Sequence, residues 1–177
     1  MGPRRVEGGG DLLQMLVLAG IGLSLVGDVA LLFEGPGAWL LGLLLFLGAH
    51  LAYTAAFLLR GVGALWTPAV GVVVFGGASG WLVKRLWAGV GELRGPVVLY
   101  AATITAMAAA AFATLAGPWP PAAAAAGAVG ALFFYLSDAT LAWNRFVEPF
   151  PRGRTLTLLL YWIGQLGIAL AARWASG

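Results

Sequence analysis

Cysteine is absent from the 177 residues of the chain, and histidine occurs once, as His50. The lack of cysteine excludes disulfide bonds, thiol nucleophiles and thiolate metal sites. A single histidine excludes a zinc site built on two or more imidazole ligands. We therefore expect no metal and no other cofactor, although two carboxylates and one imidazole remain a conceivable set of metal ligands.

Charged residues are also scarce. They make up 10% of the chain, while hydrophobic residues make up 61%. Soluble domains carry about 25% charged residues, so this composition predicts a protein with several membrane spans. The net charge is +3, but the basic residues are scattered near the ends of apolar segments. They form no basic face, and we expect no nucleic-acid partner.

Six apolar segments approach the roughly 20 residues that an α-helix needs to cross a bilayer. Because a segment in lipid must satisfy its own backbone hydrogen bonds, these continuous runs predict helices. The fold expected is an all-α transmembrane bundle, a single domain over residues 12–177 behind an N-terminal tail, residues 1–11. The Gly76-x-x-x-Gly80 spacing predicts a close helix contact. The six expected spans cover residues 12–33, 38–59, 65–83, 96–115, 122–145 and 155–172.

An even number of spans places both chain ends on one side of the membrane. That side holds four basic residues and the opposite side holds six. The excess of Lys and Arg predicts that the side with six is cytoplasmic. Its basic residues are Lys84, Arg85, Arg94, Arg145, Arg152 and Arg154.

Two aspartates, Asp28 and Asp138, lie inside expected spans. A carboxylate at the centre of a membrane helix costs at least about 2.5–3.5 kcal/mol, so such a residue usually has a function. Each aspartate is 16 residues from the expected start of its span. Both spans cross in the same direction, and at about 1.5 Å per residue both side chains reach the same depth, near the more basic surface.

Other polar side chains are expected in the same half of the membrane. His50 and Tyr53 share one helix face, and Tyr161 and Gln165 share another. Ser137, Asn144 and Arg145 lie close to Asp138 in sequence. A simpler interpretation also stands: the aspartates hold helices together, the histidine and tyrosines pack in the core, and the arginines only orient the protein.

Four sequence segments recur in a known order: G-D-V-A-L-L-F at 27–33, H-L-A-Y at 50–53, S-D-A-T-L-A-W-N-R-F at 137–146 and Y-W-I-G-Q at 161–165. Their order and spacing resemble the YhhN family of lysoplasmalogenase-like integral membrane proteins. The resemblance implies that the family's first two spans have no equivalent here. It also implies that the two Asp segments occupy matching places in two repeated halves, an arrangement that often puts a site between the halves.

By this resemblance, the expected activity is hydrolysis of the vinyl ether bond of a lysophospholipid in a bacterial inner (cytoplasmic) membrane. The products would be a fatty aldehyde and a glycerophospho-ethanolamine or glycerophosphocholine. Our hypothesis is that Asp28 and Asp138 are the catalytic pair: one protonates the alkene carbon, and the other steadies the cation and activates water. Two carboxylates in one apolar cavity resist ionising together. His50, Tyr53, Ser137, Asn144, Tyr161 and Gln165 would orient the pair or the substrate, and Arg145 would meet the headgroup.

Two other functions remain open at this point. A proton-coupled transporter of small molecules or lipids would use the same aspartates equally well. A structural or lipid-sensing membrane protein would use them only to hold its helices together. The sequence leaves the oligomeric state open.

Overall fold

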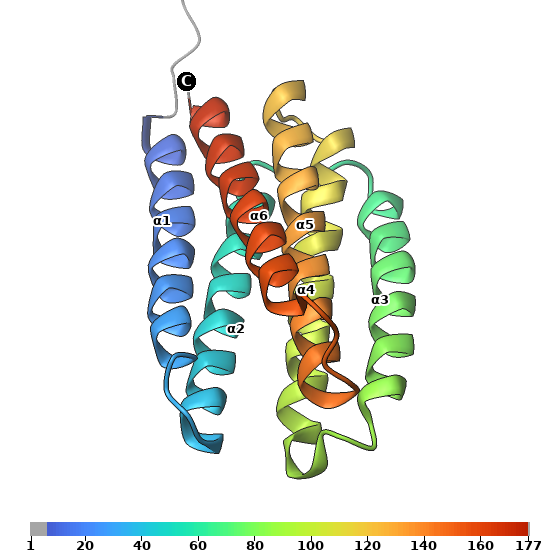
Figure 1. Ribbon diagram of the computed structural model, residues 1–177. Helices are drawn as coiled ribbons and strands as arrows, with labels where there is room; N and C mark the ends of the chain where they lie inside the picture. Colours follow the sequence, from blue (N-terminus) through green and yellow to red (C-terminus); the bar gives the residue numbers. More distant parts are fainter. Residues whose placement is uncertain (1–6, 177) are drawn as a thin grey trace, which may run out of the picture.

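The computed structural model describes residues 7–176, and in this range it is all-α, as the sequence predicts. Six helices are long and apolar enough to cross a membrane, which confirms the expected number of spans. Figure 1 shows them running up and down the bundle. The long helices are α1 (Glu7–Ala30), α2 (Pro36–Leu59), α3 (Trp66–Leu86), α4 (Arg94–Ala113), α5 (Pro121–Phe146) and α6 (Gly153–Ser176), with short 3₁₀ turns η1 (Gly91–Leu93) and η2 (Thr114–Ala116) flanking α4. The chain is an integral membrane protein.

Proline and glycine mark the helix boundaries. Helices α2 and α5 each begin with a proline, a position where the missing N–H breaks no helical hydrogen bond. Gly35 precedes α2 with a φ of 114°, a conformation that favours glycine. Helix α1 ends at Ala30, three residues before the expected end at residue 33, because residues 31–33 form a turn. It begins at Glu7, so the part of the expected tail before that residue lies outside the described range.

Both described chain ends lie on the same side of the bundle, as an even number of spans requires (Figure 1). The Ser176 hydroxyl donates to the Gly10 carbonyl oxygen at 3.2 Å. The opposite side carries the α1–α2, α3–α4 and α5–α6 connections. On that side the guanidinium groups of Arg85, Arg94 and Arg145 lie 5.4, 4.9 and 5.8 Å from the ring centres of nearby tryptophans. Arg–Trp pairs of this kind are typical of a membrane interface.

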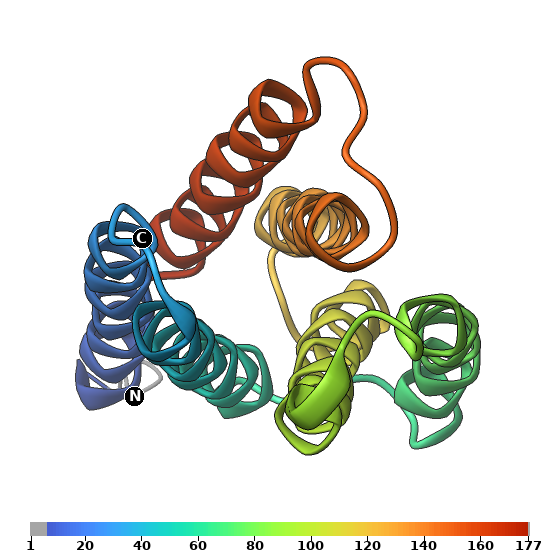
Figure 2. The same ribbon diagram turned by 60° about the horizontal axis from the view of Figure 1, so that its bottom comes forward.

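Five helices form a closed ring in the order α1, α2, α4, α5, α6, with α6 returning to α1, and α3 packs outside the ring against α4. Figure 2, viewed from the connection side, shows this arrangement. The closest pair is α5 and α6, where Gly130, Gly164 and Gly167 let the two backbones touch. The predicted contact at Gly76 and Gly80 is wrong: a Cβ added at Gly80 would have no neighbour within 4 Å, because that face of α3 points outward.

Candidate active site

The large cavity is a hollow of about 1170 Å³ that opens on the connection side of the ring. Asp28 from α1, Asp138 from α5 and Tyr161 from α6 line it, together with the α1–α2 and α5–α6 connections. The two aspartates are far apart in sequence, and the ring brings them to one cavity. Equal depth along their helices is the property from which the sequence predicted this meeting.

Asp28 lies one half-turn before the end of α1 and is partly exposed to the cavity. The Tyr161 hydroxyl donates to Asp28 Oδ2 at 2.8 Å. A phenol that donates to a carboxylate fixes its orientation and supports its negative charge. Tyr161 therefore lies at the depth that the sequence predicted for it, beside the first aspartate.

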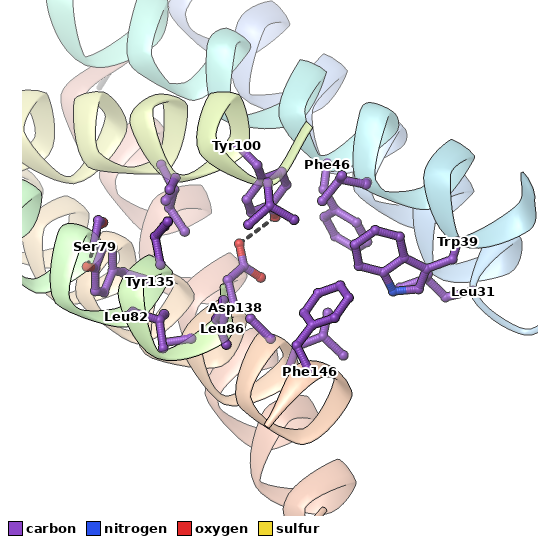
Figure 3. A pocket seen from close by; sticks show the side chains of 18 residues that line it. Leu31, Trp39, Phe46, Ser79, Leu82, Leu86, Tyr100, Tyr135, Asp138 and Phe146 are labelled. Carbon is purple, nitrogen blue, oxygen red and sulfur yellow. Dashed lines mark hydrogen bonds between the residues drawn. The ribbon is translucent and has the colours of Figure 1, made fainter. Parts of the chain in front are cut away.

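Asp138 has a second, separate set of partners. The Tyr100 hydroxyl from α4 donates to Asp138 Oδ2 at 2.6 Å, and Figure 3 shows this bond inside an apolar surround. His50 Nε2 from α2 lies 3.3 Å from the same oxygen, but without the alignment of a hydrogen bond. Because both contacts fall on Oδ2, the other carboxyl oxygen is the one left to face a substrate.

Tyr100 is the functional candidate that sequence reasoning missed. A usable signal existed in its depth. It lies six residues after the start of α4, about 9 Å into the helix, and Asp138 lies eight residues before the end of α5, about 12 Å in. Since both ends are on the connection side, the two side chains reach similar depths.

A cluster of aromatic rings closes the cavity toward the centre of the membrane. Phe134 of α5 is fully buried and makes edge-to-face contacts with His50 and Tyr161, with ring centres 4.9 and 5.4 Å apart. Beyond it, the Tyr53 hydroxyl donates to Gln165 Oε1 at 2.6 Å. Tyr53, Gln165 and His50 line neither the large cavity nor the slot described below, so the structure places them behind the aspartates rather than at the cavity surface.

Ser137 and Asn144 line the cavity, but their polar atoms already have partners. The Ser137 hydroxyl donates to the Thr157 carbonyl oxygen at 2.9 Å and so ties α5 to α6. Asn144 donates to the Thr140 carbonyl oxygen at 3.0 Å and accepts from the Phe150 N–H at 3.1 Å. Asn144 thereby fixes the α5–α6 connection, which forms one wall of the cavity.

Charged side chains surround the mouth of the large cavity. Arg145, Arg152 and Arg154 line it from the α5–α6 side, and Glu34 lines it from the α1–α2 connection. All four are exposed. The arrangement offers positive charge for a phosphate and one carboxylate for an ammonium group.

A second cavity, which we call the apolar slot, adjoins the large cavity. It has a volume of about 70 Å³ and runs between α2, α3, α4 and α5. Figure 3 shows Asp138 projecting into it between aromatic and aliphatic side chains. Both cavities share the lining residues Leu31, Trp39, Phe46, Asp138 and Leu141.

Comparison with known proteins agrees with this geometry. A sequence profile of the YhhN family matches residues 7–172. The chain belongs to the YhhN family. It is 33% identical to the bovine (Bos taurus) protein named lysoplasmalogenase TMEM86A over 159 residues, which cover 88% of this chain and 64% of the relative. It is 32% identical to the pig (Sus scrofa) lysoplasmalogenase TMEM86B over 149 residues, covering 84% of this chain and 59% of the relative. The chain thus spans less than two thirds of these relatives. No solved structure matches it significantly.

The four segments that resemble the YhhN family converge on this site. Asp28, His50, Asp138 and Tyr161 each come from a different segment, and each contacts another of these residues or lines the large cavity with one. Among the described residues, no three His, Asp or Glu side chains gather as metal ligands would. The chemistry that the site itself offers is proton transfer between carboxyl groups and a substrate in an apolar surround.

Proposed function

We propose that this YhhN protein is a membrane hydrolase of the lysoplasmalogenase type, acting through one membrane domain over residues 12–177. The observation that carries the proposal is a pair of aspartates from α1 and α5 lining one cavity, each accepting a hydrogen bond from a tyrosine. The relatives named lysoplasmalogenase support the same reaction. The substrate is a lysophospholipid with a vinyl ether bond, and the membrane is a bacterial inner membrane.

The reaction needs a donor and an acceptor of protons. One carboxyl group gives its proton to the alkene carbon that bears the alkyl chain, and the alkene electron pair forms the new C–H bond. The carbon next to oxygen becomes an oxocarbenium ion, which the other carboxylate stabilises. That carboxylate then takes a proton from water as the water oxygen bonds to the cation. The resulting hemiacetal collapses to an aldehyde and a glycerol hydroxyl group, and both carboxyl groups return to their starting states.

The charges at the mouth fit the remainder of the substrate. Arg145 and its neighbours on the α5–α6 connection would bind the phosphate, and Glu34 would lie near the ammonium group of an ethanolamine or choline headgroup. The headgroup then stays at the membrane interface, where these side chains are exposed. Only the bond to be cleaved has to reach the aspartates.

The test is aldehyde release by the purified chain from a vinyl-ether lysophospholipid and from its saturated alkyl-ether analogue. We expect cleavage of the first only. Asp28→Asn and Asp138→Asn should each reduce the rate by about 10²–10⁴-fold, the usual contribution of a general acid or base. Asp11→Asn is the matched control, because Asp11 is exposed at the far end of α1.

Two results would contradict the proposal. Full activity in both aspartate variants would remove the catalytic pair. Proton-coupled flux into vesicles without any aldehyde would instead support the transporter function of the same aspartates.

A further inference from the structure

The apolar slot begins where the large cavity ends. Asp138 is the one titratable carboxyl group in the lining that the two cavities share, and Asp28 lines the large cavity alone. Beyond Asp138 the slot continues past Leu82, Ile104 and Tyr135, a surface that is almost entirely apolar. Its direction is away from the charged mouth and toward the centre of the membrane.

We propose that the apolar slot holds the part of the substrate's alkyl chain next to the alkene, and that Asp138 is therefore the proton donor. This inference rests on the hydrolase function proposed above. A single-chain ether lipid is polar at one end and apolar at the other. The continuous path from the arginines through Asp138 into the slot has the same polarity in the same order.

The spacing along α5 fits this placement. Arg145 is seven residues from Asp138, which corresponds to about 10.5 Å along the helix. In the substrate, the chain-side alkene carbon is seven bonds from phosphorus, on the order of 9 Å when extended at about 1.5 Å per bond. A phosphate near Arg145 therefore brings the alkene to the level of Asp138, and the chain continues toward Tyr135.

The placement separates the roles of the two aspartates. Protonation must occur at the chain-side carbon, which faces the slot, where Asp138 projects. Water must add to the carbon bonded to oxygen, which faces the large cavity, where Asp28 and Tyr161 lie. Asp138 is thus the acid in the first step, and Asp28 accepts the proton of the attacking water.

The first test locates the chain without requiring catalysis. The probe is a saturated alkyl-ether lysophosphatidylcholine that carries a photoreactive diazirine near the ether end of its chain. With the full chain in phosphatidylcholine vesicles, we expect cross-links at Leu82 and Ile104 that an excess of unlabelled alkyl-ether lysolipid displaces. Val73 is the control: it lies on α3 with Leu82 but is 74% exposed, so its labelling should resist displacement. Labelling of the slot that is absent or not displaced overturns the inference.

The second test narrows the slot. Ala101 lines it, while Ala102 is exposed on the same helix and lines neither cavity. Ala101→Leu should reduce kcat/KM for a long-chain vinyl ether on the order of 10–200-fold, the effect of methylene-sized misfits in an apolar pocket. A propenyl substrate, with almost no chain, should be cleaved normally by the variant, and that activity also demonstrates folding. Identical behaviour of Ala101→Leu and Ala102→Leu overturns the inference.

The third test concerns the proton donor. In D₂O, the Asp28→Asn variant can still protonate carbon, but it traps the cation slowly, so the cation returns to alkene. Recovered substrate should then carry deuterium on the chain-side alkene carbon. Asp138→Asn should show none. Any other pattern overturns the assignment of Asp138 as donor.

Failure of the slot and failure of the hydrolase function give different results. Displaceable labelling of the slot without aldehyde release from the vinyl ether keeps the chain-binding slot and rejects the hydrolase. Aldehyde release with labelling only at exposed positions keeps the hydrolase and rejects the slot.

Discussion

Removal of one hydroxyl group should separate catalysis from binding. In Tyr100→Phe, Asp138 loses the hydrogen bond that it accepts at 2.6 Å. As Asp138 gives up its proton, negative charge grows on the oxygen that this phenol supports. The bond is therefore stronger in the transition state than in the substrate complex. Hydrogen bonds to charged groups contribute about 1.5–3 kcal/mol. At about 1.4 kcal/mol for each tenfold change, kcat should fall about 10- to 150-fold while KM changes little.

The assay is steady-state aldehyde release by purified protein in detergent micelles, with the thermal midpoint measured on the same samples. Thr103→Val is the matched control, because it removes a buried hydroxyl one turn away on α4 that bonds only the Leu99 carbonyl oxygen. It should leave kcat unchanged. A kcat for Tyr100→Phe within about threefold of the unmodified protein, well below the expected loss, would refute a transition-state role for this bond. An equal loss in Thr103→Val would reduce the effect to packing.

Two further substitutions test packing and headgroup binding. A Cβ at Gly130 would lie 2.7 Å from the Ile168 backbone nitrogen, so Gly130→Ala should destabilise the α5–α6 pair by about 1–3 kcal/mol and lower the thermal midpoint. Gly77→Ala, with no neighbour within 4 Å, should be neutral or stabilising by up to about 1 kcal/mol, and an equal loss in both would refute the contact. Arg145→Gln should raise KM about two- to fivefold for a phosphate-bearing substrate, a small effect because the side chain is exposed. It should not affect an uncharged vinyl-ether glycerol, and Arg85→Gln, which lines neither cavity, should change neither KM.

The span positions were predictable because length and hydropathy are properties of each segment alone. The boundaries agree within a few residues, and the largest shifts occur where local turns or the 3₁₀ segment η1 replace the expected helix end or start. The convergence of Asp28 and Asp138 was predictable for a related reason. A fixed rise per residue converts sequence position into depth, and depth does not depend on how the helices are rotated.

Features that depend on helix rotation were not predictable in the same way. The spacing of Gly76 and Gly80 is that of a packing motif, but nothing in α3 alone states which face meets a neighbour, and this face points outward. The close contact formed instead at Gly130, where α6 contributes Gly164 and Gly167. Tyr100 was missed because its role arises only when α4 packs beside α5.

The same limit explains Ser137 and Asn144. Their proximity to Asp138 in sequence suggested that they orient the catalytic pair. In the structure the Ser137 hydroxyl bonds the Thr157 carbonyl oxygen of α6, and Asn144 bonds the α5–α6 connection. A hydroxyl or amide has several backbone groups within reach in any helical bundle, so its partner is decided by tertiary packing. Their contribution to function is to shape the wall of the large cavity.

The surroundings of the aspartates also bear on the choice between hydrolysis and transport. A transporter must open its site to each side of the membrane in turn. Toward the far side, the aspartates are followed by Phe134 and Tyr53, both fully buried, and then by the α5–α6 contact at Gly130, where backbones touch. Opening that path would break the closest helix pair of the bundle. A hydrolase of membrane lipids needs no second opening, because its substrate enters and its products leave on one side. The closed far side and the short route from the charged mouth to Asp138 therefore favour hydrolysis over transport.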